Sequence, residues 1–260
     1  MVEFLDAVGP IEPHPTDHGP IVGDYCETMR MTTLILVRHG RTAANRDGIL
    51  AGWTPGITLD DVGETQAAAV ALRLAGIPIN GVVSSPLERT VQTAEAIVGE
   101  RDFDIALDPR IGECKYGDWT GRPLRELAKE PLWKIVQNHP SAAVFPGENG
   151  ESIRDMAHRA ISAVHHWNEQ FGPEGIYVMV SHGDVIKAIV SNALGTHLDL
   201  YQRVQIDPCS VSVIQYTPSR PFAIHVNDTG SDLSRLIPTK KSKRAHKGDA
   251  VLGGGAGHVA

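Results

Sequence analysis

Short apolar runs alternate with segments of helical character along most of this chain, and that alternation is the strongest constraint on its fold. Each run spans four to six residues of strand-forming character. Alternation of this kind is typical of a mostly parallel sheet with helices on both faces. The sequence therefore predicts an α/β fold, a three-layer α/β/α sandwich around a mostly parallel sheet. The expected strands are 33–37, 81–84, 104–107, 176–180, 211–216 and 221–226, and the expected helices are 64–75, 85–98, 122–138, 152–167 and 184–193.

Composition excludes several classes of protein. The chain has 260 residues and a formal net charge of −7, which argues against a general nucleic-acid binder. No apolar run approaches the roughly 20 residues that a membrane span needs. The three cysteines are widely scattered, so they predict neither a disulfide framework nor a paired metal-ligand spacing. A reducing cytoplasm is the expected location.

The two ends of the chain differ from its middle. Residues 1–30 lack periodicity and carry several prolines and glycines, so we expect a disordered extension without a signal peptide, and Met31 is a candidate native start. Residues 236–260 hold a basic cluster followed by glycines, and we expect a disordered tail there. One catalytic domain is expected at 31–230.

Two apolar runs end in the same way, with a histidine and a glycine. "LILVRHG" delivers Arg38 and His39 and then turns at Gly40, and "IYVMVSHG" delivers His182 and Gly183. In an open α/β sheet, ligands bind outside the carboxyl ends of the parallel strands. We therefore expect both junctions at one edge of the sheet, facing a ligand.

The helix after 81–84 has a clear start signal. Ser85 is placed to cap it, Pro86 fits its first turn, and Glu88 completes a capping box. Arg89 follows in the first turns, where the helix dipole favours anions rather than cations. An anionic partner would explain an arginine at this position. Glu113 stands in a glycine-flanked loop, "IGECKYGDWTG", before the next helical segment.

Together these residues supply two guanidiniums, two imidazoles and one carboxyl group, which fits phosphoryl transfer through nitrogen. A neutral imidazole is a competent nucleophile near neutral pH. Guanidiniums bind phosphate oxygens in a forked, charge-assisted way. A second, protonated histidine can offset negative charge on the phosphoryl oxygens. The carboxyl group can protonate the leaving alkoxide and then deprotonate water, so no metal or other cofactor is required.

At these residues the sequence resembles the histidine phosphatase superfamily, in its phosphoglycerate mutase-like group. "LVRHGRTAAN" is similar to the family signature, "SSPLERTVQTA" to its second phosphate-binding block, "ECKYGDWTG" to its acid-bearing loop and "VSHGDVI" to its second histidine block. The resemblance covers roughly residues 32–227 and implies a phosphoglycerate mutase-like fold.

The resemblance also implies a role for each residue. His39 would accept the phosphoryl group as a phosphohistidine, Glu113 would donate the proton, and Arg38, Arg89 and His182 would hold the transferring group. Thr42 and Asn45 would line the pocket, and the Gly183 amide would contact phosphate. Trp53 would help to form the substrate mouth. The implied substrate-binding residues are Arg38, His39, Gly40, Arg41, Thr42, Asn45, Arg89 and Gly183.

A metal-independent phosphatase acting on a small phosphorylated metabolite is the expected function, and a cofactor-dependent phosphoglycerate mutase is the alternative. Only 69 positions separate Glu113 from His182, and no two arginines are adjacent, unlike the long insertion and paired arginines of those mutases. A shorter lid would admit water and favour hydrolysis. The sequence leaves the substrate and a homo-oligomeric state open.

Other function classes fit the sequence less well. A metal hydrolase built on His39, His182, Asp184 and the His165–His166 pair lacks an H-E-x-x-H spacing. A serine hydrolase would need a G-x-S-x-G elbow, which is absent. An inactive binding module would have lost a catalytic residue, and all five are present.

Overall fold

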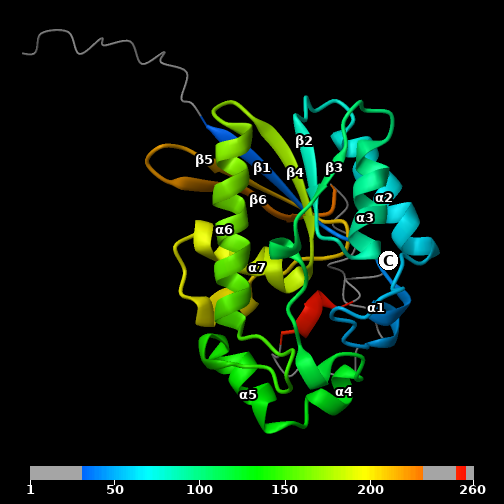
Figure 1. The fold of residues 1–260 in the computed structure, drawn as a ribbon, viewed down its shortest axis with the longest axis vertical. Coiled ribbons are helices and arrows are strands. Elements are labelled where there is room, and N and C mark those ends of the chain that lie inside the picture. The colour runs from blue at the N-terminus through cyan, green and yellow to red at the C-terminus, as the bar shows by residue number, and fades with distance from the viewer. Residues whose placement is uncertain (1–30, 231–249, 256–260) are drawn as a thin grey trace, which may run out of the picture.

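The computed structural model of the chain describes residues 31–230 and 250–255. Its strands are β1 (Thr32–Arg38), β2 (Gly81–Ser84), β3 (Ile105–Leu107), β4 (Ile176–Ser181), β5 (Val211–Tyr216) and β6 (Pro221–Asp228). They form one sheet in the order β3-β2-β4-β1-β5-β6 (Figure 1). The first four pair in parallel, and β5 and β6 join antiparallel beside β1. The expected mostly parallel sheet is therefore confirmed.

Helices cover both faces of this sheet. None of the helices among the described residues is both long and apolar enough to cross a membrane. The α-helices are α1 (Ala43–Asp47), α2 (Asp61–Leu74), α3 (Glu88–Val98), α4 (Leu124–Leu127), α5 (Pro131–Asn138), α6 (Ile153–Phe171) and α7 (Gly183–Ala193). Short 3-10 turns follow at η1 (Pro109–Ile111), η2 (Gly117–Trp119), η3 (Pro140–Ala142), η4 (Leu198–Arg203) and η6 (Leu252–Gly254).

Alternate residues of the central strand face two separate cores. Leu34 and Leu36 of β1 pack into the cluster shared with α6 and α7. Ile35 and Val37 pack into the cluster shared with α2 and α3. Successive strand side chains point to opposite faces, so a strand that is apolar at every position needs a helical layer on each side. Figure 1 shows α2 and α3 on one side of the sheet and α6 on the other.

The pairing of β1 with β4 determines where the two histidines lie. The strands are parallel neighbours, and Arg38 at the end of β1 is opposite Ser181 at the end of β4. His39 and His182 are the next residues, so both leave the sheet at the same edge. The two strand–His–Gly junctions thus share one edge, as the sequence predicts.

Two local predictions are wrong. Ser85 does not cap α3, whose N-cap is Leu87 with no side-chain cap; the Ser85 hydroxyl accepts from His182 at 2.8 Å and from the Leu87 amide at 3.4 Å. The Glu88 carboxylate likewise accepts from the Gly56 amide rather than completing a capping box. The predicted helix 122–138 is divided into α4 and α5, because Pro131 suits a first helical turn but cannot continue a preceding helix.

The described part of the chain includes a piece of the predicted tail. The expected extension at 1–30 lies outside the described residues, as do 236–249 and 256–260, so the domain boundaries remain a prediction. Residues 250–255, however, pack against the carboxyl edge of the sheet instead of forming a disordered tail. Leu252 is 1% exposed there, and its burial in the main core supplies the apolar anchor that composition did not indicate.

Gly40 and Gly63 let the loop after β1 approach the first turn of α2. A Cβ on Gly40 would lie 2.6 Å from the Gly63 carbonyl oxygen, and a Cβ on Gly63 would lie 2.0 Å from the Arg41 carbonyl oxygen. Gly40 is not in the left-handed region, so close approach rather than a sharp turn explains this glycine. The contact holds the loop that carries His39 against a helix.

We expect Gly63→Ala to lower the free energy of unfolding by about 1–3 kcal/mol, because the added methyl overpacks a backbone contact that cannot yield. Chemical denaturation would measure the change. Gly76→Ala is the matched control, since a Cβ there meets nothing within 4 Å, and its effect should stay within about 0.5 kcal/mol. Equal stability of the two variants would contradict the proposed close contact.

Candidate active site

The carboxyl edge of the sheet brings three predicted side chains into direct contact. The Nε of Arg89 lies 3.3 Å from Nε2 of His39, and its Nη2 lies 3.3 Å from Nδ1 of His182. The centroids of the two imidazole rings are 5.2 Å apart. His39 follows β1, His182 follows β4 and Arg89 belongs to α3, so three distant segments converge on one point.

The hydrogen bonds of His39 determine which ring nitrogen carries the proton and which holds the lone pair. Its Nδ1 lies 2.7 Å from the carbonyl oxygen of Gly40, which can only accept, so Nδ1 carries the proton. Nε2 then holds the lone pair and accepts from Arg89. Burial lowers the pKa of His39 well below its usual value, and the charges of Arg89 and Arg38 lower it further. His39 is therefore a neutral imidazole at neutral pH, with Nε2 available as a nucleophile.

His182 is held as a neutral ring as well. Its Nδ1 accepts from Arg89, so the proton lies on Nε2 and is donated to the Ser85 hydroxyl at 2.8 Å. Burial lowers the pKa of His182 well below its usual value, and Arg89 adds to that effect. The sequence analysis expected a protonated second histidine. Burial beside arginine charges corrects this, and His182 can act only as a neutral donor in this state.

Arg89 carries a buried donor that the protein leaves unused. Its side chain is 2% exposed, and its Nη2 also donates to the Gly52 carbonyl at 2.9 Å. Its Nη1 has no hydrogen-bond partner among the described residues. Burial lowers the pKa of this guanidinium. A buried donor without an acceptor is unfavourable, so an anionic group in the site would satisfy it.

Glu113 is placed to carry a proton. It is 3% exposed, and one carboxyl oxygen accepts from the Cys114 amide at 2.9 Å. Burial raises the pKa of Glu113 to about 7, and the nearby charge of Asp184 contributes to the rise. A carboxyl group with a pKa near neutrality is suited to general acid and base catalysis.

Arg159 of α6 holds the loop that carries Glu113, and the sequence analysis did not identify it. Its guanidinium donates to the carbonyls of Arg110, Gly112 and Glu113 at 2.7, 2.8 and 2.9 Å. The remaining donors pair with Glu151, which also accepts from the Lys115 amide. Trp53 donates to the Glu113 carbonyl at 2.5 Å. The backbone around the acid is thus fixed on both sides.

Arg38 is directed toward residues 250–255. Its Nη1 donates to the carbonyls of Ile206 and Gly254 at 2.9 and 2.7 Å, and its Nη2 donates to those of Gly253 and Gly255 at 3.1 and 2.5 Å. The side chain is fully buried, and burial lowers its pKa to about 10. All four Nη hydrogens therefore have backbone partners in this structure.

Two of the predicted substrate-binding residues make contacts with other parts of the protein. The Gly40 amide donates to the Thr93 hydroxyl at 3.1 Å. The Arg41 guanidinium forms an ion pair with Asp60, the N-cap of α2, at 2.9 Å. Both contacts fix the loop after β1.

Thr42, Asn45 and Gly183 also belong to the edge of the site. Thr42 caps α1, and its hydroxyl both accepts from the Asn45 amide and donates to the Asn45 side chain. Asn45 lines the cavity, whereas Thr42 is buried behind it. Gly183 starts α7, and a Cβ on it would lie 3.0 Å from the Cα of Gly254.

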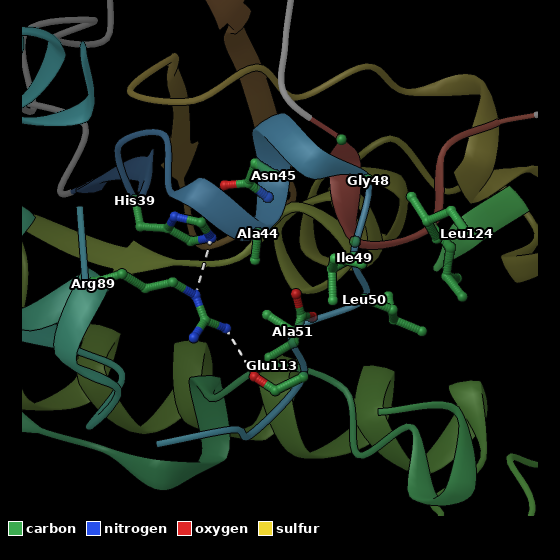
Figure 2. Close-up of a pocket in the computed structure, with 14 residues that line it drawn as sticks. His39, Ala44, Asn45, Gly48, Ile49, Leu50, Ala51, Arg89, Glu113 and Leu124 are labelled. Atoms are coloured by element: carbon green, nitrogen blue, oxygen red, sulfur yellow. Dashed lines mark hydrogen bonds between the residues drawn. The ribbon is translucent and has the colours of Figure 1, made fainter. Parts of the chain in front are cut away.

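One small cavity joins these groups. Figure 2 shows the His39 imidazole, the Arg89 guanidinium and Glu113 around it, with Asn45 beside them. Its free volume is about 20 Å³, roughly the space of one water molecule. Leu252, Gly253 and Gly255 form part of its wall, and Arg38 and His182 lie outside its lining. Within the described ranges, no three His, Cys, Asp or Glu side chains are grouped to hold a metal ion.

Comparison with known proteins agrees with this geometry. The sequence model of the family described as "Histidine phosphatase superfamily (branch 1)" matches residues 34–229. A relative named "Probable phosphoglycerate mutase GpmB" from Cronobacter sakazakii is 31% identical over 210 residues, which cover 79% of this chain and 95% of the relative.

Two solved structures extend the comparison. A phosphoserine phosphatase mutant from Entamoeba histolytica, solved with phosphoserine, is 28% identical with a TM-score of 0.69, and the match covers 76% of this chain and 98% of that one. The alpha-ribazole phosphatase from Shigella flexneri is 25% identical with a TM-score of 0.67, and the match covers 77% and 99%. Similarity thus extends over nearly the whole of each relative.

We expect nitrogen-15 NMR to find His39 as the Nδ1–H tautomer with a pKa well below 6.5. Arg89→Gln should raise that pKa, because it removes a positive charge that opposes protonation of the ring. Arg220→Gln, which changes an exposed arginine in the turn between β5 and β6, should leave it unchanged. An ordinary His39 pKa in the unmodified protein, or no response to Arg89→Gln, would contradict this description.

Proposed function

This chain belongs to the histidine phosphatase superfamily, and on that premise we propose that it is a phosphatase that hydrolyses a small phosphomonoester through a phosphohistidine on His39. One observation carries the proposal. A neutral imidazole whose Nε2 carries no proton accepts a hydrogen bond from a buried guanidinium that has an unused donor, on a cavity that is also lined by a protonatable carboxyl group. These groups together suit nucleophilic attack on phosphorus.

In the first step, Nε2 of His39 attacks phosphorus and the bond from phosphorus to the ester oxygen breaks. The proton of Glu113 passes to that oxygen, so the alcohol leaves neutral. Arg89 supplies charge-assisted donors to the phosphoryl oxygens while charge builds on them. The raised pKa of Glu113 supports this step, because the group is substantially protonated at neutral pH.

In the second step, the Glu113 carboxylate takes a proton from water and the resulting hydroxide oxygen attacks phosphorus. The nitrogen–phosphorus bond breaks, inorganic phosphate leaves, and His39 returns to its neutral form. Glu113 is protonated again and the cycle can repeat. Each group therefore ends in the state in which it began, with no metal ion in the scheme.

Phosphatase is favoured over mutase by the length of the segment that could shield the site. His182 follows Glu113 by only 69 positions, and part of that length forms α6 and β4 rather than a lid. A mutase must keep water from its phosphoenzyme, whereas a phosphatase must admit it. Phosphoglycerate mutase activity remains the second candidate, because relatives over most of the chain carry that name.

The substrate class is a small phosphorylated metabolite. The solved relatives include a phosphoserine phosphatase and an alpha-ribazole phosphatase. Their names support a small alcohol as the leaving group. We also propose a cytoplasmic location, since Cys114 and Cys209 are free and buried, as suits a reducing compartment.

His39→Ala should abolish both phosphate release and the acid-labile, base-stable label left by brief incubation with a phosphomonoester. The reason is that no other neutral imidazole nitrogen faces the cavity among its lining residues. His165→Ala, which changes an exposed histidine of α6, is the control and should retain both. Near-normal hydrolysis by His39→Ala would refute the mechanism. A mutase-coupled assay with 3-phosphoglycerate, run beside phosphate release, would decide between the two activities.

Hydrolysis of alkyl phosphates should fall as the pH rises through about 7, because Glu113 loses the proton that the leaving alkoxide needs. Glu113→Gln should remove this alkaline limb and slow alkyl substrates by about 10²–10⁴-fold. Aryl phosphates should slow much less, because phenolates leave without a proton. The low pKa of His39 places the acid limb below 6.5. Equal losses for alkyl and aryl substrates would show that Glu113 is not the acid.

A further inference from the structure

Residues 250–255, which we call the glycine segment, lie directly on the predicted phosphate site. Figure 1 shows the segment, in red, below the sheet between α7 and α1. Its carbonyls at Gly253, Gly254 and Gly255 accept three hydrogen bonds from Arg38, at 3.1, 2.7 and 2.5 Å. The fourth Nη hydrogen of Arg38 goes to Ile206. Arg38 therefore has no Nη donor left for a phosphoryl oxygen while the segment is in place.

Contacts outside the phosphate site anchor the segment. Gln137 of α5 pairs with both the amide and the carbonyl of Ala250, at 2.8 and 3.0 Å. Lys187 of α7 donates to the Val251 carbonyl at 3.2 Å, and Asp184 accepts from the Gly253 amide at 2.9 Å. Together with the buried Leu252 side chain, these bonds hold the segment against α5 and α7.

Glycine is required where the segment meets Arg38. Gly254 has a φ of +76°, which favours glycine, and a Cβ on it would lie 2.9 Å from Nη1 of Arg38 and 3.2 Å from the Cα of Gly183. A larger residue would hold the backbone away from the guanidinium. The glycines of this stretch thus allow its backbone to approach the Arg38 guanidinium closely.

We propose that the glycine segment is an internal ligand of Arg38 that competes with the phosphoryl group for its Nη donors. The inference rests on the proposed function and on the expectation, from the family resemblance, that Arg38 binds the phosphoryl group. Carbonyl oxygens occupy the donors that phosphate oxygens need, and the remaining cavity of about 20 Å³ holds little more than a water molecule. A phosphoryl group in contact with His39 and with the Nη atoms of Arg38 requires the segment to leave. The buried Nε of Arg38, by contrast, has no hydrogen-bond partner among the described residues and is not held by the segment.

The chemistry allows such an exchange. Neutral carbonyls occupy the Nη donors of Arg38, and the nearby charges of Glu113, Asp207 and Asp184 act on its guanidinium without a hydrogen bond to it. A phosphate dianion would supply stronger, charge-assisted bonds to the same donors. The apparent affinity for phosphate is then the intrinsic affinity multiplied by the fraction of molecules in which the segment is displaced. Loosening the anchor should therefore tighten phosphate binding.

The test measures binding of inorganic phosphate to the full chain by isothermal titration calorimetry, without any turnover. Gln137→Ala removes two anchoring bonds at a distance from Arg38, and Gly254→Ala adds a methyl group that clashes with it. Each variant should lower the Kd for phosphate by about 10-fold or more. Gly195→Ala is the control, since Gly195 also has a positive φ but no neighbour within 4 Å of a Cβ, and its Kd should match the unmodified protein.

If Gln137→Ala binds phosphate with unchanged or weaker affinity, the segment is part of the phosphate site or irrelevant to it, and the inference fails. Failure to bind phosphate in every variant would also overturn it. Should Gly254→Ala not fold, Gln137→Ala decides alone. Tighter phosphate binding without hydrolysis of any phosphomonoester would sustain the inference and reject the proposed function, so the two are separately tested.

Discussion

Two buried guanidiniums without a carboxylate partner in their hydrogen bonds are the constraint on which the rest of this site depends. Arg38 and Arg89 direct their bonds to backbone carbonyls and to imidazole nitrogens in the described residues. Buried charges are tolerated only when polar groups surround them. Their field, added to burial, keeps both histidines neutral. In the proposed mechanism, one arrangement would thus prepare an anion site and a nucleophile together.

The sequence predicted the parts of the site that depend on local pattern. Apolar strands that end in His–Gly placed His39 and His182 at one edge of a mostly parallel sheet, which followed from the alternation of strands and helices, whereas the direct pairing of β1 with β4 came from the structure. Ser85 was misassigned, because a serine before a helix has the same local signature whether it caps the helix or pairs with a distant histidine. Its partner, His182, is 97 positions away in the chain, and a local sequence pattern cannot predict so distant a contact.

Arg159 and the glycine segment escaped prediction for a related reason. Arg159 lies on α6, where the sequence pattern predicts only which apolar residues face the core. Its guanidinium binds three carbonyls of a loop 46–49 positions earlier in the chain, a contact that the pattern does not predict. The glycine segment has the composition of a flexible tail, yet a buried leucine and hydrogen bonds with Arg38, Gln137, Lys187 and Asp184 dock it on the domain. Composition describes average behaviour, whereas docking depends on a few specific contacts.

The glycine segment also bears on the choice between hydrolysis and phosphoryl transfer. A mutase needs a cover that excludes water while the phosphoryl group is on the histidine. If the phosphoryl group and the segment compete for Arg38, the segment cannot cover the phosphohistidine, because the phosphoryl oxygens then occupy the donors that hold it in place. The segment would be displaced at the stage when shielding matters, and water would reach phosphorus. Competition at one arginine therefore favours hydrolysis by the same geometry that limits access of phosphate to the resting site.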